Sequence, residues 1–197
     1  MATESSLEVG DPIRPPAGRC PVLVGGVGYR WQSDASFGVV AVDELAEHRW
    51  PCGTDILDLG YGAIYVAEDL LAASPPYRKA IFLAGVPRGR EPGHFYRWRW
   101  EDRRVDPEEV QERIREAGAG VVHLDHLLVV AEHFGALPPD VVVLEAEPVC
   151  TDPGEELSPE VDRLLPKAVR WVRREVEEVT EGGGGPAPPF PHAAEAG

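Results

Sequence analysis

Basic residues are scarce in this sequence. Its 197 residues include 19 Lys and Arg against 34 Asp and Glu, which gives a formal net charge of -15. A phosphate backbone or an anionic lipid surface would be repelled by this charge rather than neutralised. The composition therefore argues against nucleic acid and against a membrane surface as partners.

Cysteines and long apolar runs are also scarce. The three cysteines, Cys20, Cys52 and Cys150, are an odd number and form no C-x-x-C pair, so neither a disulfide framework nor a cysteine zinc site is indicated. No apolar run approaches the roughly 20 residues needed to span a bilayer, and no apolar segment follows a charged start. Together these features predict a cytoplasmic protein with reduced thiols.

Several catalytic and nucleotide-binding motifs are missing. The sequence has no Gly-Lys-Ser/Thr P-loop, no Gly-x-Ser-x-Gly elbow, and no Ser, Cys or paired-Asp arrangement for ordinary proteolysis. Gly26 and Gly28 begin a dinucleotide fingerprint, but its third glycine falls on Trp31, whose indole would block close packing of helix on strand. A nucleotide-binding α/β module is therefore only a weaker alternative.

The length suits one domain with two loose ends. Residues 21–180 carry the apolar patterning of a folded α/β domain, whereas residues 1–20 have almost none. Residues 181–197 are rich in glycine and proline, a composition typical of a disordered tail. We expect both ends to be disordered.

Apolar runs alternate with amphipathic segments along this domain, which predicts an open, mostly parallel sheet with helices on both faces. Strands are expected at residues 21–28, 54–59, 79–86, 94–100 and 140–147. Helices are expected from residue 36, at 63–73, 106–117 and 122–134, and from residue 157. The strand at 94–100 alternates aromatic with basic residues, as an edge or antiparallel strand does. Pro166 should kink or restart the last helix.

Four side chains are candidates for chemistry. Asp34 follows the first predicted strand and Asp58 ends the second, positions at which open α/β sheets keep their sites. Either could instead cap a helix or turn. His123 and His126 lie three residues apart beside Asp125 and could share a helix face. The simpler interpretation, which we favour for this cluster, is the solvated side of an amphipathic helix.

The order of these elements and the residues between them resemble one family, the hydrogenase maturation proteases. The resemblance covers most of the chain and implies a phosphorylase/hydrolase-like three-layer sandwich. It rests on residues 23–28 with Asp34 and 37–39, on 55–60, on Pro92-Gly93, and on Glu147-Pro148 with Gly154 and 157–161.

Members of this family are cytoplasmic endopeptidases that remove a C-terminal peptide from the large-subunit precursor of a nickel-iron hydrogenase. The resemblance thus implies this precursor as partner and no permanently bound cofactor. It also implies that two acidic residues and a histidine grip the nickel already loaded into the substrate, which acts as a Lewis acid on the scissile carbonyl or activates a water. It predicts no oligomeric state.

The family's ligand positions match this sequence incompletely. Asp34 matches the first of two acidic residues, but Ala35 stands at the second, which is the ligand. Gly85 stands at the second acidic ligand, at the end of the third strand. His123 is the nearest candidate for the histidine, although an ungapped match places Gly120 there.

Two interpretations of this incomplete match remain open. In the first, the protein is a working protease that uses Asp34, Asp58 and His123 as substitute ligands, with His126 as a further candidate. In the second, it is a pseudo-protease that binds a hydrogenase precursor or accessory protein without cutting it. Neither interpretation provides a secure metal site, since alanine and glycine cannot coordinate nickel.

Overall fold

The computed structural model describes residues 21–51, 53–101 and 106–181. The disordered tails expected at 1–20 and 181–197 lie outside these residues, apart from Glu181, the last residue of the final helix.

In the described part of the chain, five strands form one sheet in the order β2-β1-β3-β5-β4. The strands are β1 (Val22–Val27), β2 (Thr54–Asp58), β3 (Lys79–Gly85), β4 (Phe95–Arg99) and β5 (Asp140–Ala146). Neighbouring strands are parallel except for β4, which is antiparallel to β5 at the sheet edge. The predicted mostly parallel sheet and the aromatic edge strand are both confirmed.

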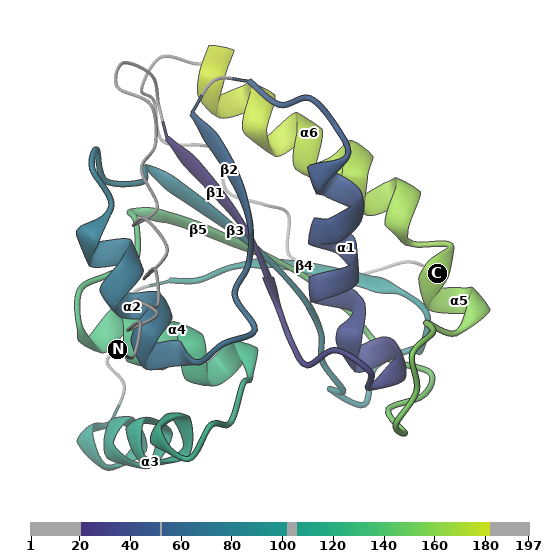
Figure 1. The fold of residues 1–197 in the computed structure, drawn as a ribbon, viewed down its shortest axis with the longest axis horizontal. Coiled ribbons are helices and arrows are strands. Elements are labelled where there is room, and N and C mark those ends of the chain that lie inside the picture. Colours follow the sequence, from purple (N-terminus) through teal and green to yellow (C-terminus); the bar gives the residue numbers. More distant parts are fainter. Residues whose placement is uncertain (1–20, 52, 102–105, 182–197) are drawn as a thin grey trace, which may run out of the picture.

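Helices cover both faces of this sheet, as predicted (Figure 1). On one face lie α1 (Phe37–Ala46) and α6 (Leu165–Glu181), and on the other lie α2 (Ala63–Ala72), α3 (Pro107–Gly118) and α4 (Leu124–His133). A separate buried apolar cluster fills each interface between helices and sheet. The result is a three-layer sandwich. Among the helices of the described residues, none is long and apolar enough to cross a membrane.

The ends of three helices follow from their sequences. Asp106 caps α3 by accepting a hydrogen bond from the Glu108 amide, and Ser158 caps the short α5 (Pro159–Asp162) in the same way. The last predicted helix restarts instead of continuing, because α6 begins at Leu165 with Pro166 in its first turn.

One prediction on α4 was wrong. His126 was expected on the solvated side but is only 6% exposed. The reason is α3, which packs against α4 and places Glu116 3.0 Å from the His126 ring.

The amino-terminal end of the sheet contains a buried ion pair. Lys79, the first residue of β3, is 2% exposed, and its Nζ lies 2.5 Å from the carboxylate of Glu175 in α6. Asp140 lies 3.6 Å from the same Nζ and also pairs with Arg99. A buried ammonium is tolerated only when it is paired in this way.

Candidate functional site

A cavity of about 210 Å³ opens at the carboxyl ends of β1 and β3. In this sheet β2 lies on one side of β1 and β3 lies on the other, so the order in which the chain adds strands reverses between β1 and β3. Open α/β sheets bind their ligands at such a switch point. The short helix η1 (Ser33–Ser36) and the start of α4 complete the walls.

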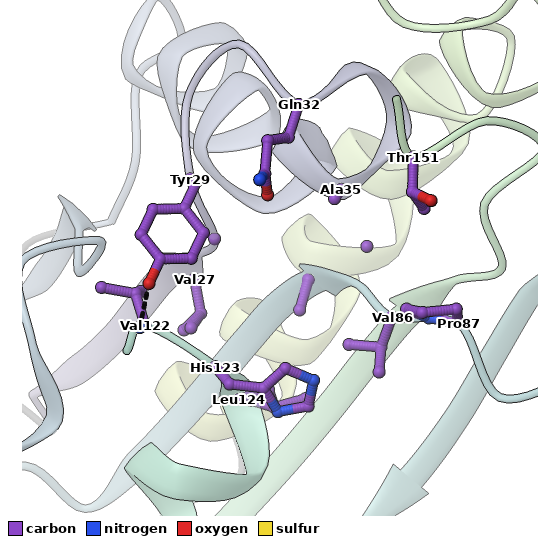
Figure 2. A pocket seen from close by; sticks show the side chains of 13 residues that line it. Val27, Tyr29, Gln32, Ala35, Val86, Pro87, Val122, His123, Leu124 and Thr151 are labelled. Atoms are coloured by element: carbon purple, nitrogen blue, oxygen red, sulfur yellow. Dashed lines mark hydrogen bonds between the residues drawn. The ribbon is translucent and has the colours of Figure 1, made fainter. Parts of the chain in front are cut away.

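The cavity is lined mainly by apolar groups. Val27, Val86 and Leu124 contribute aliphatic surface, and Gln32 and Thr151 contribute neutral polar groups. Figure 2 shows the Gln32 side chain directed toward the middle of the cavity, with the ring of His123 on the opposite side. Among the described residues that line it there is no carboxylate, lysine or arginine.

The two positions that the family resemblance matches to acidic ligands both line this cavity. Ala35 lines it from η1, and Gly85 lines it from the end of β3. A Cβ on Gly85 would lie 2.0 Å from the backbone oxygen of Asp34 and 3.0 Å from the Ala35 Cα. The end of β3 is therefore packed against the backbone of η1, which leaves no space for a side chain.

Asp34 lies beneath the cavity wall and is fully buried. One carboxylate oxygen accepts hydrogen bonds from the Val149 amide (2.8 Å), the Cys150 amide (2.9 Å) and the Ser158 hydroxyl (2.9 Å), and the other accepts one from the Ser158 amide (2.6 Å). These four donors occupy the lone pairs that a metal would need. The geometry makes Asp34 the anchor of the segment that follows β5.

Asp58 lies at the carboxyl end of β2 but does not line the cavity. Its carboxylate accepts hydrogen bonds from the Gly60 amide and from Arg30, both at 2.8 Å. Arg30 also pairs with Asp43 at 2.6 Å. The proposed alternative for Asp58, a turn cap, fits these contacts.

The two histidines face different surroundings. His123 lines the cavity and caps α4, where its Nδ1 accepts a hydrogen bond of 3.2 Å from the Asp125 amide. His126 faces α3 instead, with Nε2 close to Glu116 and Arg113. Burial lowers the pKa of His126 below its usual 6.5, although Glu116 opposes this shift. Of the four candidates, only His123 reaches the cavity.

A paired network of charges lies beside the cavity, between α4, β5 and the connection from β3 to β4. Arg88 binds Asp125 at 2.6 Å and Glu145 at 2.8 Å, and Arg90 binds Glu145 at 2.7 Å and Glu147 at 2.9 Å. Burial raises the pKa of Glu147, but hydrogen bonds from Arg90 and from two backbone amides outweigh burial and lower it overall. The carboxylates of Asp125, Glu145 and Glu147 are therefore already paired with arginine side chains.

Tyr29 connects two walls of the cavity. Its hydroxyl donates to the carbonyl of Gly120 at 2.9 Å and accepts from the Val122 amide at 2.7 Å, shown as a dashed line in Figure 2. The loop after β1 is thereby tied to the segment between α3 and α4. Gly120, which the ungapped match places at the histidine position, contributes only its backbone carbonyl to this link.

The described residues contain no group of three His, Cys, Asp or Glu side chains arranged to hold a metal ion. The three-ligand grip implied by the resemblance is therefore not reproduced by this part of the chain. Sequence reasoning also missed Gln32 and Thr151 as cavity residues. The available signal was closeness in the sequence, since Gln32 lies just before Asp34 and Thr151 lies just after Glu147-Pro148.

Comparison with known proteins identifies relatives of known structure. No protein-family model and no curated protein matches the chain. The hydrogenase 2 maturation peptidase of a Thaumarchaeota archaeon is 34% identical over 80% of this chain and 98% of its own, with a TM-score of 0.59.

Two further structures show the same fold at lower identity. The hydrogenase maturating endopeptidase HybD from E. coli is 21% identical over 83% of this chain and 94% of its own, with a TM-score of 0.61. The [NiFe] hydrogenase maturation protease HycI from Thermococcus kodakarensis is 18% identical over 82% and 95%, with a TM-score of 0.54. From the archaeal relative and the shared fold, we conclude that this chain belongs to the hydrogenase maturation protease family.

Proposed function

We propose that this protein processes the large-subunit precursor of a nickel-iron hydrogenase by removing a C-terminal peptide. The observation that supports this proposal is the cavity itself. Ala35 and Gly85, which the resemblance matches to the two acidic ligands, and His123, the nearest candidate for the histidine, come from distant parts of the sequence and line one cavity. This shared cavity supports the proposal that the reaction takes place here, although Ala35 and Gly85 stand where the family has acidic side chains.

In this reaction the chain's own residues would orient the precursor. Its nickel, carried as part of the substrate, would polarise the scissile carbonyl. The walls formed by Val27, Val86 and Leu124 would exclude water around the bound segment, and Asp34 would hold the loop that carries Thr151 against the cavity. We place this activity in the cytoplasm, in keeping with the family resemblance and with an odd number of cysteines that form no C-x-x-C pair.

A second candidate function is binding of the precursor, or of an accessory protein, without cleavage. The lack of acidic side chains in the described lining favours it, because Ala35 and Gly85 give nickel nothing to bind. The remaining candidate acids are held elsewhere. Asp34 is surrounded by donors, and Asp58 is paired with Arg30.

Intact-mass measurement of the precursor separates these candidates. The protein is incubated with nickel-loaded precursor and, as the control, with nickel-free precursor. Processing predicts that the nickel-loaded precursor loses the mass of a C-terminal peptide. An unchanged mass together with a stable complex would support the binding function, and an unchanged mass without a complex would overturn both.

A further inference from the structure

His123 is the cavity side chain whose hydrogen-bonding role can be read from its surroundings. As the residue that caps α4, it uses Nδ1 to accept a hydrogen bond of 3.2 Å from the Asp125 amide. A nitrogen that accepts a hydrogen bond carries no proton, so a neutral ring carries its proton on Nε2. The cap therefore fixes the tautomer.

The protonated nitrogen is the one available to the cavity. Figure 2 shows the His123 ring projecting between the walls, with one nitrogen on the side of Val86 and Pro87. Within the described residues, the contacts of this ring to hydrogen-bonding groups are all made by Nδ1. The cavity thus receives an N–H donor from His123.

This tautomer is the reverse of the one that favours metal binding. A histidine that binds a metal through Nε2 normally donates from Nδ1–H to a carboxylate or carbonyl. The nearest carboxylate, Asp125, lies 3.7 Å from Nδ1 but accepts two hydrogen bonds from Arg88. Binding nickel through Nε2 would therefore require moving the proton to Nδ1 and breaking the helix cap.

The rest of the cavity suits a neutral, partly apolar ligand. Its volume of about 210 Å³ is below the roughly 300 to 1,000 Å³ of ordinary small-molecule sites, so it fits a side chain better than a nucleotide. Gln32 and Thr151 add uncharged hydrogen-bonding groups, and no cation among the described residues lines it to attract a carboxylate. The net charge of -15 further disfavours an anion.

We propose that the cavity binds an apolar side chain of an extended peptide and that His123 donates its Nε2–H to a main-chain carbonyl of that peptide. The inference rests on the proposed function, because it specifies how the precursor's C-terminal segment is held. It differs from a metal grip in that His123 contributes a proton donor and no lone pair. Specificity then comes from the size and polarity of one peptide side chain.

The first test uses the free protein labelled with ¹⁵N. A long-range ¹H–¹⁵N correlation spectrum near pH 7.5 should show Nδ1 of His123 unprotonated and Nε2 protonated. Addition of NiCl₂ at one equivalent should broaden His123 no more than the more exposed His94. A protonated Nδ1, or selective broadening of His123 by nickel, would overturn the inference.

The second test compares two peptides, N-acetylated and C-amidated pentapeptides of glycine with leucine or aspartate at the centre. The leucine peptide should bind at least about tenfold more tightly, because burying an apolar side chain is favourable and burying an unpaired carboxylate is costly. Equal or reversed affinities would contradict the inference.

The matched variant is His123→Asn. Asparagine can still cap α4, so the fold is retained, but it is too short to present the cavity donor. Affinity for the leucine peptide should fall about fivefold, as expected for the loss of one hydrogen bond, while the melting temperature stays close to that of the wild type. Unchanged affinity would remove His123 from the binding site. These tests need no precursor, so their failure is distinct from failure of precursor processing.

Discussion

The two ends of β3 differ in the groups that surround a buried charged side chain. At its amino end, Lys79 is buried and balanced by the carboxylates of Glu175 and Asp140. At its carboxyl end, Gly85 has no side chain, and the nearby buried charge, Asp34, is surrounded by neutral hydrogen-bond donors. One end is built from opposite charges, and the other from backbone and neutral groups.

This difference separates stability from function. The buried ion pair lies at the end of β3 opposite to the cavity, which is at the sheet's switch point, so we expect the pair to affect folding and not binding. The buried acids of this edge, Asp34, Glu145 and Glu147, are all held by internal partners. We infer that they shape the cavity and that the cavity itself stays neutral.

The largest expected effect comes from Asp34→Ala. Three backbone amides, of Val149, Cys150 and Ser158, would lose their acceptor, which should cost about 5 kcal/mol at about 1 to 3 kcal/mol for each group. Urea unfolding monitored by circular dichroism measures this loss. Asp34→Asn, which keeps one acceptor oxygen, should lose less. Equal stability of Asp34→Ala and the wild type would show that the anchor is unimportant.

At the other end of the sheet, Glu175→Ala should cost about 4 kcal/mol, because it leaves Lys79 buried without its closest partner. The paired replacement Lys79→Met with Glu175→Leu should recover most of this stability, since no charge is then buried. Under conditions in which they are folded, the single and the double variant should both bind the precursor as the wild type does. Loss of precursor binding in the stable double variant would break the separation between the two ends.

Gly85→Ala should destabilise the fold less than Asp34→Ala or Glu175→Ala does, but it should weaken precursor binding. The added Cβ would meet the backbone oxygen of Asp34 at 2.0 Å, and overpacking of this kind costs about 2 kcal/mol. Because η1 must shift, precursor binding should fall at least about tenfold. Gly118→Ala is the matched control, since nothing lies within 4 Å of its Cβ position. If the two variants behave alike, the packing at Gly85 is not decisive.

The smallest expected effect is a pH dependence from His126. Because burial lowers its pKa below 6.5, the unfolded chain binds more protons than the folded one as the pH falls through 6.5. Stability should therefore decrease as the pH falls from 7.5 to 5.5, with Glu116, Arg113, His123 and Asp125 as the charged or titratable groups around the ring. In His126→Gln this part of the decrease should disappear. A variant with the same decrease would assign it to other groups.

The fold was predictable because its signals are local. Apolar runs bounded by glycine located the strands of the parallel sheet, and Ser158 before Pro159 located a helix start. The environment of the site could not be predicted in this way, because it depends on residues that are distant in the sequence. The role of Asp34 depends on donors more than 110 residues away along the chain, and the burial of His126 depends on how α3 packs against α4. The lack of space at Gly85 likewise appears only when η1 and β3 are brought together.

The most direct test of the account is native mass spectrometry of the hydrogenase large-subunit precursor mixed with the wild type and with Ala35→Trp. Ala35 is half-buried and lines the cavity, so an indole there should fill the space that the peptide needs. The account predicts a complex or a shortened precursor with the wild type, and neither with Ala35→Trp. It would be contradicted if Ala35→Trp bound or shortened the precursor as well as the wild type does, or if the wild type did neither.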